Sequence, residues 1–155
     1  MKPKIVRLPA FIVAGLKYRG DNKGDEIPLL WADLTPRVGE IGHRVEKACA
    51  YGVSANFDRD TGEFDYIAGF EVTQDADLPA DMAAVHIPTQ TYAVFDCILP
   101  NVKETFQRAL DEWLPTAGYE WVEAPDFELY DERFDVTMGM FDMSIYLPIK
   151  DPDAS

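Results

Sequence analysis

Residues 113–130 read Trp-Leu-Pro-Thr-Ala-Gly-Tyr-Glu-Trp-Val-Glu-Ala-Pro-Asp-Phe-Glu-Leu-Tyr. The pattern predicts a helix that ends near the tryptophan at the start of this stretch, then a turn, and then an extended segment that begins near residue 126. In an extended segment alternate side chains share a face, so Glu128 and Tyr130 are expected on the same side. A carboxylate among large apolar residues either turns to water or occupies an apolar hollow, where its charge is costly unless a ligand compensates it.

The two helices are predicted from apolar residues at helical spacing. Before the middle of the chain, Ile27, Leu30, Leu34, Val38 and Ile41 are spaced 3, 4, 4 and 3 residues apart. Pro36 interrupts this stripe, so the helix should kink or end near Leu34.

The second apolar stripe runs from Val102 to Leu114. Pro115 and Gly118 should stop this helix, because proline cannot continue a helix and glycine commonly follows its last turn.

The strands complete a repeated order of elements. They are expected at residues 4–18, 48–56, 63–72, 84–98, 126–131 and 144–150. Strand, helix, strand, strand therefore occurs twice, over residues 4–72 and 84–150. We predict an α+β fold in which the two repeats are related by a pseudo-twofold axis. Both helices would pack on one face of an antiparallel sheet, with a ligand cleft at the centre.

Composition narrows the class of protein. The 155 residues fit a single domain over residues 1–150, followed by a loose tail at 151–155. The net charge of −14 repels phosphate backbones and favours cations, so we expect no direct nucleic-acid binding. There is no signal peptide or run of membrane-spanning length, and the two cysteines do not form a CxxC motif. These features predict a cytoplasmic protein that does not contact a membrane.

Common catalytic and metal motifs are missing from the sequence. Asn56, Asp58 and Asp60 resemble the start of a calcium loop, but Ile67 stands where the bidentate glutamate is needed, which favours a hairpin turn. His43 and His86 lack a second histidine at ligand spacing. No serine lies in a G-x-S-x-G elbow. We therefore expect neither a metal ion nor a cofactor.

Glu128 and the aromatic residues remain as candidate ligand-binding groups. Each ring could simply fill the core, and the alternative is an aromatic box around one carboxylate, suited to a flat or cationic organic molecule. The predicted ligand-binding residues are Glu128, Tyr130, Trp113, Trp121, Tyr92, Tyr51, Phe70 and Trp31. If the protein is an enzyme, Glu128 is the predicted catalytic residue.

Four stretches resemble a known family. They are Glu26–Trp31 with Glu40-Ile41; Tyr51–Gly69, which contains Asp60-Thr61-Gly62-Glu63-Phe64-Asp65-Tyr66; Pro88–Phe95; and Trp113–Tyr130, closed by Ile145–Lys150. Together they resemble the GyrI-like small-molecule-binding domains, which also form the effector-binding domains of AraC-type and MerR-type multidrug-responsive regulators. The order is right and nearly the whole chain is covered.

The resemblance implies a duplicated strand-helix-strand-strand fold with an acidic residue, here Glu128, in a central pocket for cationic or polar organic ligands. No helix-turn-helix precedes the domain, so we expect a stand-alone binder of aromatic or cationic molecules that sequesters drugs or xenobiotics. One alternative is a small hydrolase of cyclopropane-bearing electrophilic toxins, as the family implies, which would use Glu128 with Trp113 or Trp121. A second alternative is a gyrase-inhibitor-like modulator of a protein partner, which would use the acidic surface and not the pocket.

Overall fold

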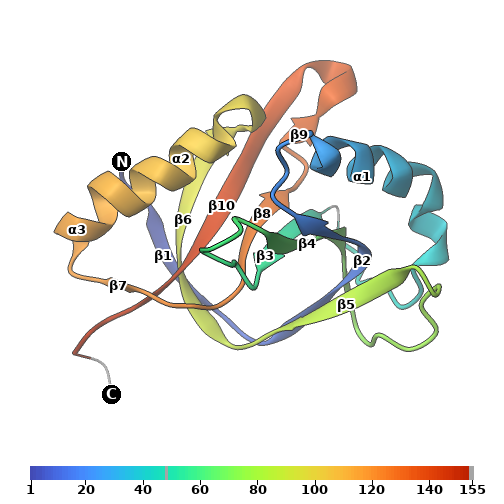
Figure 1. Cartoon of the computed structure of the whole chain (residues 1–155), viewed down its shortest axis with the longest axis horizontal. Helices are drawn as coiled ribbons and strands as arrows, with labels where there is room; N and C mark the ends of the chain where they lie inside the picture. The colour runs from blue at the N-terminus through green and yellow to red at the C-terminus, as the bar shows by residue number, and fades with distance from the viewer. Residues whose placement is uncertain (48, 154–155) are drawn as a thin grey trace. The chain divides into compact units, whose positions relative to one another are not determined.

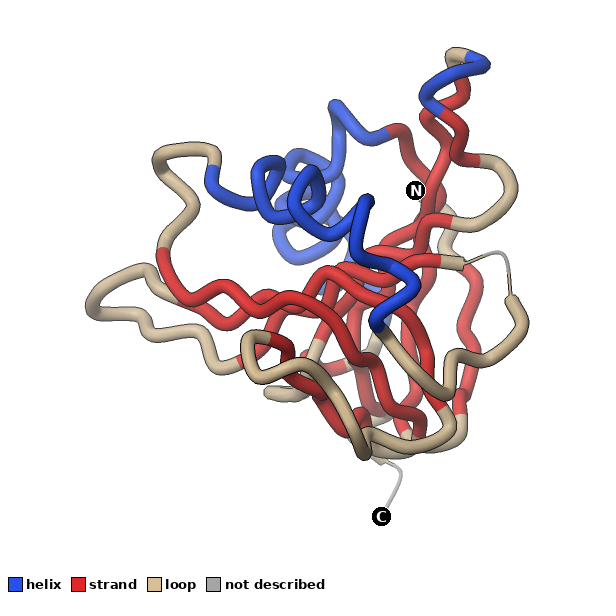
Figure 2. Tube along the Cα trace, turned by 90° about the vertical axis from the view of Figure 1, so that its right-hand side faces the viewer, coloured by secondary structure: helices blue, strands red, loops and turns tan. Residues whose placement is uncertain are grey.

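The computed structural model describes residues 1–47 and 49–153, and their contacts divide the chain into two compact units. Unit 1 comprises Met1–Pro9 and Thr89–Ser155, and unit 2 comprises Ala10–Pro88. Both combine antiparallel strands with short helices, which confirms the predicted α+β class (Figures 1 and 2). Ala48, where a predicted strand begins, and the end of the predicted tail at 154–155 lie outside the described residues. No helix of the described part is both long and apolar enough to cross a membrane.

Within its described residues, unit 2 contains four strands and one α-helix. The elements are β2 (Phe11–Gly20), α1 (Glu26–Leu34), β3 (Ala50–Ala55), β4 (Phe64–Val72) and β5 (Met82–Ile87). Strand β2 pairs with both β4 and β5, and β4 also pairs with β3, all antiparallel. Ala14, Leu16, Tyr66 and Ala68 face the helix and enclose Leu34 in the core, because alternate residues of β2 and β4 share that face.

Unit 1 is built on β6 and β10. Its elements are β1 (Lys4–Leu8), β6 (Gln90–Ile98), α2 (Val102–Arg108), α3 (Leu114–Ala117), β7 (Glu120–Trp121), β8 (Asp126–Tyr130), β9 (Phe134–Asp135) and β10 (Met140–Lys150). Strand β6 lies between β1 and β10, and β10 also pairs with β7, β8 and β9. The buried residues Ala93, Phe95, Ile145 and Leu147 carry the helical layer on one face.

Two of the predicted strands are each divided by a proline. The expected strand 4–18 consists of β1 and β2, separated at Pro9, and the expected strand 84–98 consists of β5 and β6, separated at Pro88. Proline has no N–H to give to a strand ladder, so the pairing partner can change there. As a result β1 pairs with β6, and β5 pairs with β2.

The repeated order of elements is present as β2-α1-β3-β4 and as β6-α2-β8-β10. The compact units differ from residues 4–72 and 84–150 only in their outer strands. The repeat limits and their symmetry remain predictions from element order.

The helix ends agree with the sequence in one case and differ in the other. Helix α1 ends at Leu34, and a 3-10 helix over Thr35–Glu40 follows around Pro36, as expected. The prediction that Pro115 stops the second helix is wrong. A π-helical turn at Ala109–Trp113 leads into α3, where Pro115 occupies the first turn and needs no hydrogen-bond donor. The helix ends at Gly118, which has a φ of 78°.

Candidate functional site

Glu128 lies on the helix-facing side of unit 1. In the register of β8 on β10 it is opposite Ile145, which is fully buried in the core beneath α2. The residue itself is half-buried. Its Oε1 atom accepts a hydrogen bond of 2.7 Å from the hydroxyl of Tyr130. The expectation that Glu128 and Tyr130 share a face is therefore confirmed.

The phenol of Tyr130 is fixed as a hydrogen-bond donor. Burial raises the pKa of Tyr130, and the charge of Glu128 and the hydrogen bond to it raise that pKa further. The ring of Tyr130 packs edge-on against Phe134 at a centroid distance of 4.9 Å. The hydrogen bond from Tyr130 thus orients the Glu128 carboxyl group at a half-buried position.

Asp126 is a second carboxyl of this strand that the predicted site did not include. Burial, and then the nearby charge of Glu128, raise the pKa of Asp126 to about 7. Asp126, Glu128 and Tyr130 are spaced two residues apart in one strand, so this alternation was the signal in the sequence that could have identified it. The strand therefore carries, two residues before Glu128, a carboxyl group that holds its proton more strongly than an ordinary aspartate.

The helical layer adds an indole to the same face. Trp113 packs edge-on against Phe95 at 5.4 Å and stacks on Tyr119 at 6.1 Å. Trp113 and Tyr119 pack against the core cluster that contains Ile145. Ile145 is the residue opposite Glu128 in the pairing of β8 with β10. Of the predicted residues in unit 1, Glu128, Tyr130 and Trp113 therefore lie on one side of the sheet.

Cys97 packs against the same core cluster of unit 1. Burial raises the pKa of its thiol, and its Sγ donates to Sδ of Met143 at 3.4 Å. A thiol with a raised pKa carries little thiolate near neutral pH and is a weak nucleophile.

Tyr92 and Trp121 lie away from this group. Tyr92 is fully buried and packs against Phe127 and Tyr146, whose register places them on the opposite face of the sheet. Its hydroxyl finds no hydrogen-bond partner in the described part of the chain, and burial with the nearby charge of Asp126 raises its pKa to about 12. Trp121 pairs with Ile149 in the short strand β7 and is 42% exposed.

The three predicted residues of unit 2 also divide between two faces. Trp31 donates from Nε1 to the hydroxyl of Tyr66 at 3.0 Å, and Phe70 packs on the same core beneath α1. Tyr51 lies on the other face, where it packs against Phe11 at 5.6 Å and donates to Glu71 at 3.3 Å. Trp31 and Phe70 can therefore serve one surface of this unit, and Tyr51 cannot join them there.

A family model for the GyrI-like small-molecule-binding domain matches residues 1–150. The chain belongs to this family. The GyrI-like domain described here is 37% identical to the transcriptional regulator BrlR of Pseudomonas aeruginosa, over 96% of this chain and 56% of that protein. It therefore spans little more than half the length of this relative.

Solved structures share the fold of this GyrI-like domain. SAV2435, solved with tetraphenylphosphonium bound, superposes with a TM-score of 0.74 at 19% identity over 97% of this chain and 94% of that one. The C-terminal domain of EcmrR gives a TM-score of 0.66 at 12% identity, with 97% and 98% covered. A hydrolase from Listeria innocua gives 0.53 at 11% identity, with 96% and 92% covered. Identities this low show the fold alone.

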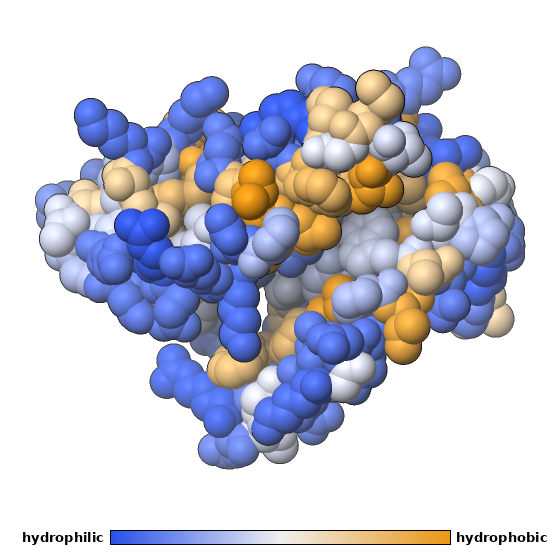
Figure 3. All heavy atoms as spheres, turned by 90° about the horizontal axis from the view of Figure 1, so that it is seen from above, coloured by the Kyte–Doolittle hydropathy of each residue, from blue (hydrophilic) through white to orange (hydrophobic). Residues whose placement is uncertain are grey.

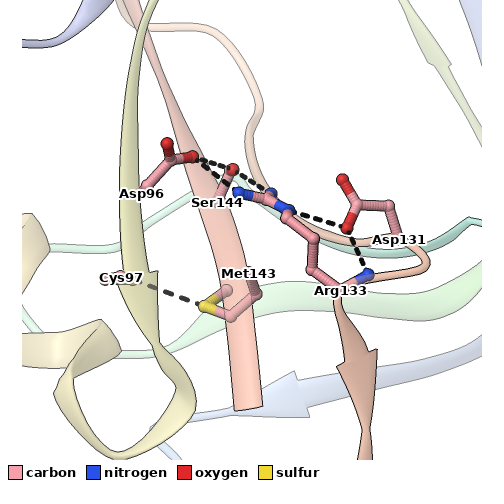
Figure 4. A network of polar contacts seen from close by, with 6 residues as sticks. All are labelled: Asp96, Cys97, Asp131, Arg133, Met143 and Ser144. Carbon is pink, nitrogen blue, oxygen red and sulfur yellow. Dashed lines mark hydrogen bonds and ion pairs between the residues drawn. The ribbon is translucent and has the colours of Figure 1, made fainter. Parts of the chain in front are cut away.

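Arg133 holds the segment that follows Tyr130 in this GyrI-like domain (Figure 4). Its guanidinium binds Oδ1 of Asp131 at 2.9 Å, Oδ1 of Asp96 at 3.1 Å and Oγ of Ser144 at 2.6 Å. Hydrogen bonds from Ser144 and Arg133 hold the pKa of Asp96 below its usual range. Burial acts to raise the pKa of Asp131, but its hydrogen bonds with Arg133 outweigh this and lower it. The network ties the end of β8 to β6 and β10.

Proposed function

We propose that this GyrI-like domain binds lipophilic organic cations that carry aromatic groups, on the helix-facing side of β8, with Glu128 as the counter-ion. The observation that carries the proposal is the half-buried Glu128 carboxylate that accepts the Tyr130 hydroxyl at 2.7 Å. Trp113 and Tyr119 belong to the same helix-facing layer. The sequestering role predicted from the sequence rests on this site.

A delocalised cation matches this arrangement physically. Such ions lose little hydration on burial compared with an ammonium group, and aromatic faces attract them through the ring quadrupole. One carboxylate in a partly desolvated position supplies the opposite charge that such an ion needs. The bound tetraphenylphosphonium of the structural neighbour SAV2435, which combines one positive charge with four phenyl rings, supports this ligand class.

The similarity to BrlR suggests a regulatory role for ligand binding. Because BrlR is a transcriptional regulator and this chain matches 56% of its length, ligand binding here would serve as the input in a protein of that design. The net charge of −14 disfavours DNA contact by the domain itself.

The test is calorimetric titration with tetraphenylphosphonium. Glu128→Gln should weaken binding by about 10- to 100-fold, the usual scale for losing a charge-assisted contact. Glu123→Gln removes the same charge from an exposed residue of the same unit and should leave the affinity unchanged. For triphenylphosphine oxide, which is uncharged, the affinities of the wild type and of Glu128→Gln should differ far less. Equal losses in Glu128→Gln and Glu123→Gln would contradict the proposal, because the field of the whole surface would then account for binding.

Hydrolysis of an activated electrophile is a second candidate function, favoured by the pair Asp126 and Glu128. A carboxyl with a pKa of about 7 beside a carboxylate that accepts a hydrogen bond is an arrangement typical of acid–base pairs. In such a reaction Glu128 would act as base or nucleophile and Asp126 as proton donor. Cyclopropane-bearing electrophiles should be consumed by the wild type and by neither Glu128→Gln nor Asp126→Asn. Accumulation of product at the wild-type rate in Glu128→Gln would contradict catalysis by this residue.

A further inference from the structure

A hairpin of unit 1 displays large apolar side chains to solvent. Strand β9 and the first residues of β10 pair as Phe134 with Phe141 and Asp135 with Met140, and a 3-10 turn at Val136–Met138 joins them. The tip projects beyond the helices of this unit in Figure 1, and strands support it at its base in Figure 2. We call residues 134–141 the β9–β10 hairpin.

The exposure of the β9–β10 hairpin is unusual for its composition. Met138 is 72% exposed, Val136 is 59% exposed, and Met140 and Phe141 are each 39% exposed. Ile98, 41% exposed, lies opposite Asp142 at the hairpin base, and Leu99 follows it at 40%. These six make up half of the twelve exposed large hydrophobic residues in the described part of the chain. Concentration of such residues in one place, rather than their scatter over the surface, is typical of an interaction site.

The tip is held in one conformation by its own polar groups. The Asp135 carboxylate accepts the backbone N–H of Thr137 at 3.0 Å and its hydroxyl at 2.6 Å. Gly139 closes the turn with a φ of 68°, and its N–H donates to the carbonyl of Val136 at 3.2 Å. At the base, the Arg133 network of Figure 4 fixes the chain just before β9. A pre-ordered apolar tip loses little conformational entropy when it binds a partner.

The charge around the hairpin determines which partner fits. Residues 130–144 contain four carboxylates, of Asp131, Glu132, Asp135 and Asp142, and the single base Arg133. Arg133 is already bound to Asp131 and Asp96, so it does not offset the charge of Glu132, Asp135 and Asp142. From above, hydrophilic side chains surround hydrophobic ones that gather on the visible face (Figure 3). The hairpin thus combines apolar contact area with a negative rim.

A second copy of the chain is a poor partner for this surface. Its hairpin would bring the same negative rim, and its net charge of −14 would oppose association. Methionine side chains adapt to apolar surfaces of different shapes and are common where helical peptides dock. A basic amphipathic segment offers leucine-like residues to the tip and lysine or arginine to the rim.

We infer that the β9–β10 hairpin is a docking surface for a basic amphipathic segment of a protein partner, separate from small-molecule binding at Glu128. The partner's apolar side chains contact Val136, Met138 and Phe141, and its basic side chains pair with the acidic rim. This inference does not depend on the ligand proposed above, because none of these residues belongs to the Glu128 site.

The test uses a fluorescein-labelled amphipathic helical peptide of leucine and lysine, measured by fluorescence anisotropy in 0.15 M salt, about the physiological ionic strength. The double variant Val136→Ser, Met138→Ser removes apolar surface from the tip. Its matched control, Leu29→Ser, Phe57→Ser, changes two residues of unit 2 that are 64% and 63% exposed. Both variants keep the net charge. The tip variant should bind about tenfold more weakly, and the control should match the wild type.

Three outcomes would overturn the inference. The first is equal affinity of the tip variant and the control, which would mean that net charge alone attracts the peptide. Binding of a matched peptide of leucine and glutamate as tightly as the lysine peptide would show that the negative rim has no role. The third is a wild-type dimer in light scattering that becomes a monomer in the tip variant, which would assign the surface to a second copy.

Discussion

The first strand of more than two residues after the helical segment differs sharply between the two units. In unit 1 this strand is β8, whose helix-facing residues are Asp126, Glu128 and Tyr130. In unit 2 it is β3, where Gly52 and Ser54 pair with the helix-facing residues Ala68 and Tyr66. The same order of elements thus carries acid and phenol groups in one unit and small side chains in the other.

A hydrogen-bonded tyrosine is present in both units, with different consequences. Tyr66 accepts the indole N–H of Trp31 at the bottom of a closed core, where it is only 1% exposed. Tyr130 donates to Glu128 at a half-buried position. The first contact joins two neutral groups and the second orients a carboxyl group. Removing the Tyr66 hydroxyl should therefore mainly lower stability, and removing the Tyr130 hydroxyl should mainly change ligand binding.

The largest expected effect separates the two indoles of unit 1. Trp113→Ala should lower the free energy of unfolding by about 2–4 kcal/mol, because Trp113 packs on Phe95 and Tyr119 within the core cluster. Trp121→Ala should cost about 0.5 kcal/mol, since this ring is 42% exposed. Urea unfolding of both variants measures the difference. Similar losses would mean that Trp121 is packed as tightly as Trp113.

Asp126 should make unit 1 sensitive to pH. Its folded pKa of about 7 lies above the ordinary aspartate value of 3.8, so between these two pH values the folded state holds a proton that the unfolded state releases. Stability due to this group is therefore present at pH 4 and is lost as the pH rises through 7. Asp126→Asn should be more stable than the wild type at pH 8 by about 1–3 kcal/mol, with little gain at pH 4.

Thermal unfolding from pH 4 to 8 tests this. Asp151→Asn, which changes an exposed aspartate of the same unit, is the control. A wild-type and an Asp126→Asn curve that stay parallel over the whole range would show that Asp126 ionises normally.

Part of this arrangement could be predicted from the sequence. The period-2 alternation of residues 126–130 places Glu128 and Tyr130 together, because it depends only on local backbone geometry. The same rule also applies to Asp126, but its raised pKa depends on burial by the surrounding fold. Likewise, Trp31 and Phe70 could be proposed as aromatic candidates, but the face of each ring could not be assigned.

Long-range pairing explains the rest. Tyr51 is opposite Gly69 in the β3–β4 ladder, and that register puts it on the face away from α1. The pairing of β1 with β6 brings together residues that are far apart in the sequence, such as Val6 and Tyr92, and no local pattern specifies this pairing. Because a π-helical turn precedes Pro115, this proline lies in the first turn of α3 and does not end the helix.

The two tyrosines give a smaller, more specific test. Tyr66→Phe leaves the Trp31 indole without this acceptor and should cost about 1 kcal/mol of stability. Tyr130→Phe should change stability less but alter tetraphenylphosphonium affinity, because the orientation of Glu128 is lost. Unfolding and titration of both variants give the four values needed. If Tyr66→Phe and Tyr130→Phe lowered stability and affinity by the same amounts, there would be no distinction between a core tyrosine and a site tyrosine.

The smallest expected effect links ligand binding to the proton on Asp126. A cation at Glu128 favours the ionised form of Asp126, so binding should lower that pKa from about 7 and release protons near neutral pH. Affinity for tetraphenylphosphonium should rise about threefold between pH 6 and 8, as the second negative charge appears.

Calorimetry in phosphate and in Tris, which differ in ionisation enthalpy, measures the protons released directly. Asp126→Asn should abolish both the release and the pH dependence. The two histidines, residues 43 and 86 of unit 2, remain in the variant, so any effect they have persists there. Unchanged proton release in Asp126→Asn would assign the linkage to another group. Loss of release with unchanged Glu128 dependence would leave the counter-ion role intact and would show that the two carboxyls, although neighbours in β8, act independently.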